Sequence, residues 1–546
     1  MTNLNPQQKI AVNSNAKRIV CLASAGSGKT FVLLQRINRI IADGAAADSI
    51  LALTFTNAAA HEMLDRYKRE HPNTNYTPVF STFHAFCYSI IIHDTMVRSI
   101  LGYSGIPSIA TDEDIRRIAV KVKLICGTKL SDKKLAGKRT ALSTKEQFEY
   151  DVYWKQYKKQ FALENLITFD MMCDEVANLF IRNHGCVQQY KEKYKYIFAD
   201  EHQDTNSTQM DFLSSFTEAN LYVCGDPQQM LYRFRGCTND IIKKLAESSD
   251  WELIKLPHNY RSTRQIVEYS NRIFADAWKD SEYYLAGESD VEGGRVIVRG
   301  KFPTSGPALS RMAAQLIEDC ADKTVAVICR TNSEVDDLRT IFSDMKVPIR
   351  GKSNKDTIIH ILRSALDSKY CVNWLSSQLP IEEYMAYTRM CVLRPEIQEE
   401  DKFIPIFGTK FVKIIGMIFD VRKALSQPSM LSALMTTCET IKFRLGADTL
   451  ANCVNIQEGV QKIIECLEQT TDTGVYIGTI HSVKGLEYDI VHVIGVNSRS
   501  FPVYKDEDNM ACYYVACTRA KTQLTIWCDD EVKYYDAPEG IFDGTL

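Results

Sequence analysis

Short hydrophobic runs alternate with longer amphipathic stretches along much of the chain. The first runs, at residues 18–22 and 50–54, flank a segment with helical periodicity that extends to about residue 42. This βαβ rhythm is typical of a parallel sheet. From about 93 to 195 the strand signals vanish and amphipathic helical patterns dominate, which predicts a helical insert. Strand-like runs then return, at residues 196–199, 221–224 and 252–256.

A second βα series begins near residue 295 and is interrupted in the same way. Its strand-like runs are followed by a helix-rich stretch from roughly 353 to 469, and apolar runs resume at 475. The pattern predicts an α/β fold with two cores of parallel sheet, each carrying a mainly helical insert. The predicted boundaries are 1–92 and 196–280 for the first core, 93–195 for its insert, 281–352 and 473–546 for the second core, and 353–472 for the second insert.

Composition excludes several classes of protein. The 546 residues include 65 Lys+Arg and 68 Asp+Glu, a net charge of −3, which argues against a wholly basic coat protein and against an acidic tail protein. A hydrophobic content of 45% is that of an ordinary globular chain. None of the 17 cysteines forms a Cys-x-x-Cys pair, and no run of 18 apolar residues occurs. We therefore expect reduced thiols, no membrane span and a cytoplasmic protein.

The segment 23–30, Ala-Ser-Ala-Gly-Ser-Gly-Lys-Thr, follows the first predicted strand and opens a helix. A phosphate-binding loop requires this context, because glycines let backbone N–H groups wrap phosphates at a helix N-terminus. Lys29 would supply a point charge, and Thr30 a hydroxyl ligand for Mg²⁺. The first position of the usual pattern is Ala23 instead of glycine. The residues expected around the phosphates are Ser24, Ala25, Gly26, Ser27, Gly28, Lys29 and Thr30.

Two carboxylates, Asp200 and Glu201, follow the apolar run 196–199. A carboxylate at the C-terminal end of a strand is placed to hold Mg²⁺, and its neighbour is then free to orient or deprotonate the attacking water. The alternative is a helix N-cap pair, because Asp and Glu favour the first turn of a helix. Together with the phosphate loop, the pair predicts hydrolysis of ATP or GTP.

The ordered set of motifs resembles the UvrD/Rep/PcrA branch of the superfamily 1 helicases across nearly the whole chain. The matching segments are LNPQQ from Leu4, ASAGSGKT from Ala23, LALTFTNAAAHEM from Leu51, STFHAF from Ser81, FADEHQDTN from Phe198, VCGDPQQMLYRFRG from Val223, LPHNYRST from Leu256, GTIHSVKGLEYD from Gly478 and YVACTRAK from Tyr514. So many motifs in family order make coincidence implausible. The resemblance implies two tandem RecA-like domains that hydrolyse ATP with Mg²⁺.

The resemblance also implies roles for residues around the base and the ribose. Gln8 looks like the glutamine that reads the adenine, and Arg36 and Tyr260 look like the pair that sandwiches its ring. Glu487 would lie near the ribose. An ordinary polar role is the alternative for Gln8 and Arg36, and core packing is the alternative for Tyr260.

Three further residues would act on the γ-phosphate. Gln229 would contact it and report its loss. Arg261 and Arg519 resemble two arginine fingers, whose guanidinium groups stabilise charge on the transferred phosphoryl group. A surface ion pair is the alternative for either arginine. Because Lys29 lies in the first core and Arg519 in the second, the resemblance implies that hydrolysis opens and closes a cleft between the cores.

A motor that walks along a single strand needs aromatic platforms for bases and donors for phosphates. The family positions that line this track correspond to Phe55, Thr56, Asn57, His84, Tyr232, Phe234, Arg235, Asn332 and His481. Core packing is the alternative for Phe55, as it is for His481. Residues 121–160 of the insert hold eleven Lys/Arg against four Asp/Glu, interleaved with aromatic side chains. They favour nucleic-acid contact, although a solvated lysine face over an ordinary helical core is the alternative.

Some positions depart from the family pattern. His202 stands where an aromatic residue or alanine is more usual, and Arg233 occupies a position often filled by glycine. Residues 508–511 replace the acidic and arginine residues that commonly precede the last motif. The second insert is also shorter than in the large bacterial members. These changes put the coupling of hydrolysis to movement in doubt, but not hydrolysis itself.

We expect an ATP-dependent DNA helicase that translocates 3′ to 5′ on single-stranded DNA and unwinds single/double-strand junctions. The alternatives are a translocase that displaces proteins with little unwinding and a non-catalytic DNA-binding subunit. A nucleotide kinase, a third alternative, would not need the DNA-track motifs. Replication or repair proteins are the expected partners, and the nucleoid, or the cytoplasm of a host if the gene is viral, is the expected location.

Overall fold

The computed structural model describes residues 4–72, 76–135, 142–231, 240–350, 474–496 and 506–528. The chain divides into two compact units, one of residues 1–302 with 480–545 and one of residues 303–479 with Leu546. Helices alternate with parallel strands in both units, so the prediction of an α/β fold with parallel sheets is confirmed. The predicted second insert, 353–472, lies outside the described residues.

A six-stranded sheet forms the centre of the first unit. Its strand order is β3-β2-β6-β7-β1-β8, and all neighbouring strands are parallel. Strand β6 pairs with β2, so the helical insert between them in sequence leaves the sheet continuous. The strands are β1 (Arg18–Ala23), β2 (Ile50–Thr54), β3 (Val79–Thr82), β6 (Tyr196–Ala199), β7 (Asn220–Gly225) and β8 (Glu252–Leu256).

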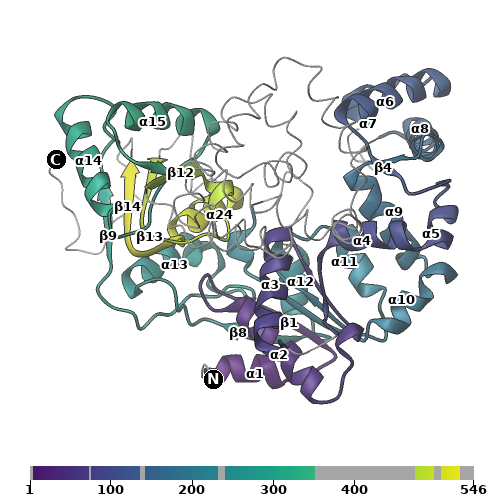
Figure 1. The fold of residues 1–546 in the computed structure, drawn as a ribbon, viewed down its shortest axis with the longest axis horizontal. Helices are drawn as coiled ribbons and strands as arrows, with labels where there is room; N and C mark the ends of the chain where they lie inside the picture. The colour runs from purple at the N-terminus through teal and green to yellow at the C-terminus, as the bar shows by residue number, and fades with distance from the viewer. Residues whose placement is uncertain are drawn as a thin grey trace, which may run out of the picture. The chain divides into compact units, whose positions relative to one another are not determined.

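Both faces of this sheet are buried, which explains why its strands read as continuous apolar runs. Side chains alternate along β1, so that Ile19 and Cys21 join one hydrophobic cluster while Val20 and Leu22 join another. The cluster around Ile19 and Cys21 includes residues of three helices that lie beside β1 in Figure 1. These helices are α1 (Pro6–Asn13), α2 (Lys29–Ala42) and α3 (Asn57–Glu70).

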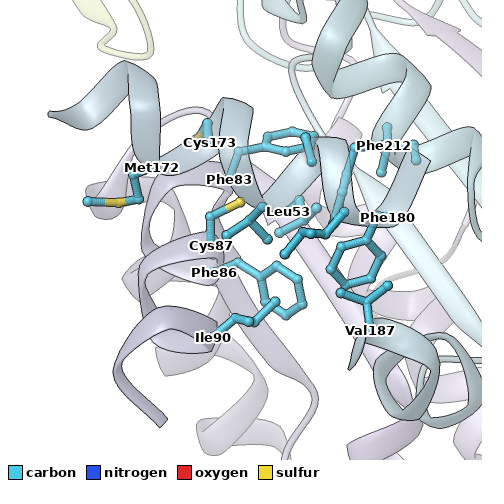
Figure 2. Packing of buried hydrophobic residues seen from close by; sticks show 14 of the residues in the cluster. Leu53, Phe83, Phe86, Cys87, Ile90, Met172, Cys173, Phe180, Val187 and Phe212 are labelled. Atoms are coloured by element: carbon cyan, nitrogen blue, oxygen red, sulfur yellow. The ribbon is translucent and has the colours of Figure 1, made fainter. Parts of the chain in front are cut away.

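The cluster on the other face continues into the helical insert. Figure 2 shows Leu53 of β2 among aromatic side chains that come from the helices of this face. The rings of Phe180 and Phe212 lie 4.8 Å apart in an edge-on arrangement. Because buried residues of the insert belong to the same cluster as the sheet, the insert shares the core of the first unit. The main helices involved are α4 (Phe83–His93), α6 (Asp112–Cys126), α8 (Thr144–Leu163), α9 (Phe169–Ile181) and α11 (Ser207–Ser214).

The insert also contains two short strands that the sequence pattern did not predict. Strands β4 (Ser108–Ile109) and β5 (Leu166–Ile167) form a parallel pair. Each has only two residues, which is too short for an alternating pattern to be recognised. The remaining helices of the first unit discussed below are α12 (Asp240–Glu247), α13 (Arg264–Trp278) and α24 (Glu507–Cys517).

Six further parallel strands are described, three in each unit. In the first unit, β14 (Ala520–Cys528) pairs with β13 (Tyr488–Val496) and with β9 (Arg295–Arg299). In the second unit, β12 pairs with β10 and with β11. The second unit consists, in the described part, of α14 (Gly306–Asp319), β10 (Val325–Cys329), α15 (Asn332–Asp344), β11 (Ile349–Arg350) and β12 (Val475–Thr479). No helix among the described residues is both long enough and apolar enough to span a bilayer.

Candidate nucleotide-binding site

The phosphate loop lies at the carboxyl edge of the first sheet, between β1 and α2. Gly26 and Gly28 have φ angles of +71° and +79°, a left-handed conformation that favours glycine. A Cβ atom on Gly26 would lie 2.7 Å from Cβ of Arg261, so this glycine is also required by a close approach. The loop is tied to the neighbouring strand, because the Ser24 hydroxyl donates to the Pro257 carbonyl at 3.0 Å. The loop conformation that the sequence predicts is therefore present.

Lys29, the first residue of α2, is surrounded by carboxylates. Burial of the ammonium group would lower its pKa, but the negative charges of Glu201 and Asp226 outweigh this effect and raise the pKa of Lys29. Asp200 contributes in the same direction. Lys29 therefore remains a cation, at the position where the phosphates of a nucleotide would meet the N-terminus of α2.

Asp200 and Glu201 differ in their electrostatic environment although they are adjacent in sequence. Asp200 is 5% exposed, and burial, followed by the charge of Glu201, raises its pKa to about 6. Burial also acts to raise the pKa of Glu201, but Lys29 and Lys484 outweigh it and hold this pKa at about 2. Glu201 is thus the carboxylate that stays ionised. Its backbone has a φ of +52°, an unusual conformation for glutamate that is often found at functional sites.

The oxygen atoms near Asp200 fit a magnesium ion. The Thr30 hydroxyl donates to Oδ2 of Asp200 at 3.3 Å, so the two predicted ligands are within reach of one ion. Hydroxyl and carboxylate oxygens are ligands that Mg²⁺ prefers, and Mg²⁺ commonly completes its coordination with substrate phosphates and water. Glu201 occupies the N-cap position of the short helix His202–Asp204, but its side chain forms no capping hydrogen bond there.

A chain of hydrogen bonds connects Asp226, Gln229 and Arg519. Nε2 of Gln229 donates to Asp226 at 2.7 Å, and Nη2 of Arg519 donates to Oε1 of Gln229 at 3.1 Å. Arg519 is 2% exposed, and burial, followed by the charge of Arg261, lowers its pKa to about 9. The alternative of a surface ion pair is therefore wrong for Arg519. Lys29 and Arg519 both lie in the first compact unit, so this site is built within that unit.

Arg261 and Glu487, which are far apart in sequence, form an ion pair. Nε of Arg261 lies 2.6 Å from Oε2 of Glu487, and Nζ of Lys521 lies 3.0 Å from Oε1. Burial would raise the pKa of Glu487, but the bond from Lys521 and the charge of Arg261 lower it. The side chain of Arg261 is 18% exposed, so one predicted finger is partly accessible while the other, Arg519, is enclosed.

Gln8 and Tyr260 lie against the phosphate loop, as their predicted roles require. Nε2 of Gln8 donates to the Ser27 carbonyl at 3.1 Å, and the Tyr260 N–H donates to the Gly26 carbonyl at 2.9 Å. The hydroxyl of Tyr260 accepts a hydrogen bond from Asn5, which also forms a capping box with Gln8. The Tyr260 side chain is half exposed, so the core-packing alternative is wrong for it.

The prediction that Arg36 sandwiches the adenine is not supported and requires a correction. Arg36 is 4% exposed, and Nη1 donates to the carbonyls of Ala11 and Val12, at 2.8 and 3.2 Å. Its guanidinium also lies 5.4 Å from the centroid of the buried Tyr222 ring. Arg36 therefore holds the end of α1 onto α2, and its charge is directed into the protein.

Phe31 is the aromatic residue that sequence reasoning missed on this side of the loop. A Cβ atom placed on Gly28 would lie 3.5 Å from Nε2 of Gln8 and 3.9 Å from Cβ of Phe31. Gln8 and Phe31 thus flank the same glycine. The position of Phe31, directly after Lys29 and Thr30, could have indicated a role at the nucleotide. An aromatic residue there is, however, equally typical of an apolar position of the helix.

A buried ion pair between Lys484 and Asp204 was also missed. The Lys484 ammonium group donates to the carboxylate of Asp204 and, at 3.3 Å, to the carbonyl of Gln229. Asp204 is 1% exposed, so Lys484 supplies the compensating charge that a buried carboxylate requires. Both residues lie inside quoted motifs, which is the only signal that marked them. His202, two positions before Asp204, is buried, and burial lowers its pKa to about 4.

The predicted nucleic-acid residues occupy several parts of the structure. Thr56 caps α3 through its hydroxyl, and Asn57 accepts a hydrogen bond from Thr82 at 3.4 Å. The ring of His84 lies 6.3 Å from that of Phe169, an exposed aromatic residue that the sequence analysis did not single out. Phe55 is half buried after β2, and His481 lies in the short helix Ile480–Val483 of the first unit. Asn332 opens α15 in the second unit. The remaining predicted residues, Tyr232, Phe234 and Arg235, are outside the described residues.

The basic segment of the insert fits its alternative better than the prediction. Tyr153 and Tyr157 are buried and their rings stack at 5.7 Å, whereas Phe148 is 72% exposed. Some lysines are neutralised, as Lys121 is by Glu164 at 3.1 Å. Most of the interleaved aromatic residues therefore form the helical core, and Phe148 is the large aromatic side chain that is free to contact a ligand in the described part of 121–160.

Comparison with known proteins places these observations in a family. Residues 4–250 match the UvrD/REP helicase N-terminal domain, and residues 254–355 and 395–530 match the UvrD-like helicase C-terminal domain. A probable DNA helicase II homolog of Mycoplasma capricolum is 25% identical over an alignment of 606 positions, which covers 95% of this chain and 83% of that protein. The ATP-dependent DNA helicase PcrA of Staphylococcus epidermidis is 24% identical over an alignment of 625 positions, which covers 96% of this chain and 83% of that protein.

The corrected position of Arg36 predicts an effect on stability. Replacing it with methionine leaves the carbonyls of Ala11 and Val12 without their donor, so the free energy of unfolding in denaturant should fall by about 1–3 kcal/mol. The exposed Lys9, replaced by methionine, serves as the control and should leave stability unchanged. A weakened affinity for ATP with unchanged stability would show instead that Arg36 contacts the nucleotide.

Proposed function

Because the chain belongs to the UvrD/REP helicase family, we propose that it is an ATP-dependent DNA helicase that translocates 3′ to 5′ on single-stranded DNA. The observation that carries the proposal is the convergence of Lys29, Glu201 and Arg519 on one partly buried cluster of charges. A phosphate-binding cation, an ionised carboxylate and an arginine finger are the groups that γ-phosphate hydrolysis requires. A protein that only binds DNA would not need them together.

In this proposal Glu201 is the general base. It takes a proton from water as the water oxygen attacks the γ-phosphorus, and the bond to the β–γ bridging oxygen breaks, so that ADP and phosphate form. Lys29 and Lys484 keep Glu201 ionised and therefore able to accept that proton. Thr30 and Asp200 would hold Mg²⁺, which neutralises phosphate charge when it is bound.

Gln229 and Arg519 form the γ-phosphate side of the proposed site. Gln229 links the arginine finger to Asp226 through two hydrogen bonds. Loss of the γ-phosphate would therefore change the contacts along this chain. Arg261, paired with Glu487, is the second finger. Because Arg519 is buried, no water around it has to rearrange as negative charge develops on the transferred phosphoryl group. Such preorganisation is the condition for effective electrostatic catalysis.

The base would bind on the outer side of the phosphate loop. Tyr260 offers a half-exposed ring, and Gln8 offers an amide next to Gly28. Phe31 flanks the same glycine and replaces Arg36 as the second neighbour of the adenine ring in this proposal. Glu487 lies beside Arg261, where the ribose side of the nucleotide is proposed to bind.

Single-stranded DNA is the proposed track, bound by bases stacking on aromatic side chains. The contact of His84 with the exposed ring of Phe169 supports a stacking platform at the start of α4. Thr56 and Asn57 lie at the N-terminus of α3, a favourable position for a phosphate group. The proposal extends to strand junctions and to replication or repair proteins as partners, in the nucleoid of a cell or in the cytoplasm of a host.

The catalytic proposal predicts the effect of replacing Glu201 with glutamine. Loss of the base should lower DNA-stimulated ATP hydrolysis by about 10²–10⁴-fold, measured as phosphate release with and without single-stranded DNA. ATP binding should persist, because Lys29 and the phosphate loop are unchanged. Glu218, an exposed residue whose side chain is 83% accessible, provides the control when replaced with glutamine. Unchanged hydrolysis in the Glu201 variant would exclude this residue as the base.

The polarity proposal predicts a difference between two DNA substrates. With ATP, a duplex carrying a 3′ single-stranded tail should be unwound faster than the same duplex carrying a 5′ tail, because translocation towards the duplex starts on the 3′ tail. Strand separation is measured by gel or fluorescence, together with displacement of streptavidin from the strand end. Equal unwinding rates would contradict the polarity, and displacement without unwinding would favour a translocase that clears proteins.

A further inference from the structure

Lys243 of α12 has its ammonium group over two adjacent aromatic rings. Nζ lies 4.2 Å from the centroid of the Trp278 ring and 4.8 Å from that of Tyr283. It also donates to both carboxylate oxygens of Glu507, at 3.1 and 3.2 Å. Only 14% of the Lys243 side chain is exposed, so the rings and the carboxylate replace most of the water around this charge.

Three helices meet at this group, since Lys243 belongs to α12, Trp278 ends α13 and Glu507 begins α24. Nε1 of Trp278 donates to Oε1 of Glu507 at 3.1 Å, which holds the carboxylate from a second side. The Trp278 ring also packs on Phe274 at 4.3 Å, and Phe274 contacts Tyr514 of α24 edge-on at 5.9 Å. We refer to Lys243, Trp278 and Glu507 as the α24 anchor.

Helix α24 connects the anchor to the arginine finger. Nε of Arg519 donates to the carbonyl of Val515 at 2.9 Å, in the last turn of the helix. The guanidinium is therefore bonded back to α24 and moves with it. A shift of the helix would separate Arg519 from Gln229, which it contacts at 3.1 Å.

The contacts of the anchor are directional, unlike ordinary apolar packing. A cation centred over a ring and bonded to both oxygens of a carboxylate has one favourable position, whereas packed aliphatic side chains tolerate small displacements. Three apolar residues would join the helices without removing a charge from water. The presence of a lysine at position 243 is explained if fixing the position of α24 is more important than stabilising the contact between the three helices.

We propose that the α24 anchor positions Arg519 for catalysis, so that Lys243, Trp278 and Glu507 act as positioning residues for ATP hydrolysis. The inference rests on the proposed function. Trp278 belongs to one hydrophobic cluster with Ala25 of the phosphate loop, whereas Lys243 binds Glu507 at the start of α24, so the effect of Lys243 on Arg519 passes through the helix. Loss of the anchor should therefore slow the chemical step and leave nucleotide binding largely intact.

The test is steady-state ATP hydrolysis by the full chain at saturating single-stranded DNA. Lys243→Met removes the charge while it keeps the length of the side chain, and kcat should fall about tenfold with KM for ATP within about twofold of the wild type. Lys243→Arg keeps a cation over the rings and should retain at least about half of the wild-type kcat. Lys244→Met is the matched control, because Lys244 is exposed on the same helix, and it should leave both constants unchanged.

Wild-type kcat in Lys243→Met would overturn the proposal, as would a loss that appears only in KM or one that Lys243→Arg fails to restore. Thermal unfolding of each variant shows whether a lower kcat reflects loss of fold. If the wild type itself hydrolyses no ATP, the proposed function fails, and hydrogen exchange then tests the anchor separately. Amides of residues 507–517 should exchange faster in Lys243→Met than in Lys244→Met, and equal rates would overturn the anchor.

Discussion

The burial of opposite charges at the carboxyl edge of the first sheet is the constraint on which the site depends. The charge of Lys29 is stabilised because Glu201 and Asp226 lie around it. The charge of Glu201 is stabilised in turn by the cations that face it. Removing one member leaves another charge buried without compensation, which is strongly unfavourable. The parallel strands fix the spacing of these groups, since β6 and β7 are adjacent and end beside the loop that follows β1. Chemistry and stability therefore depend on the same residues.

The same constraint explains how a distant part of the chain completes the site. Arg519 enters a region where a charge has almost no access to water, so its place must be set by hydrogen bonds and by the helix that precedes it. Gln229 receives it on one side, while the anchor around Lys243 holds the other end of α24. Lys484 brings a further cation from the same C-terminal segment to Asp204. The buried position of Arg519 is therefore a consequence of how α24 is held against its neighbouring helices.

The sequence predicted the sheet and the strand–loop–helix context of the phosphate loop well, because buried parallel strands read as apolar runs and the candidate groups follow them directly. It could not predict Arg36, since helical periodicity does not distinguish a side chain that faces a ligand from one that binds carbonyls of a neighbouring helix. The same limit applies to Tyr153 and Tyr157, whose spacing suits a buried face as well as a stacking platform. The pairing of Lys484 with Asp204 joins residues 280 positions apart, and neither local pattern reveals the other.

The central claim is that Arg519 and Lys29 act on the same nucleotide. The most direct test is the turnover of ATP by the Arg519→Ala variant at saturating single-stranded DNA, measured beside the affinity for a non-hydrolysable ATP analogue. The account predicts that kcat falls by at least about 10³-fold, as expected for loss of an arginine finger, while the affinity changes by less than about tenfold. A variant that retains wild-type turnover would contradict it.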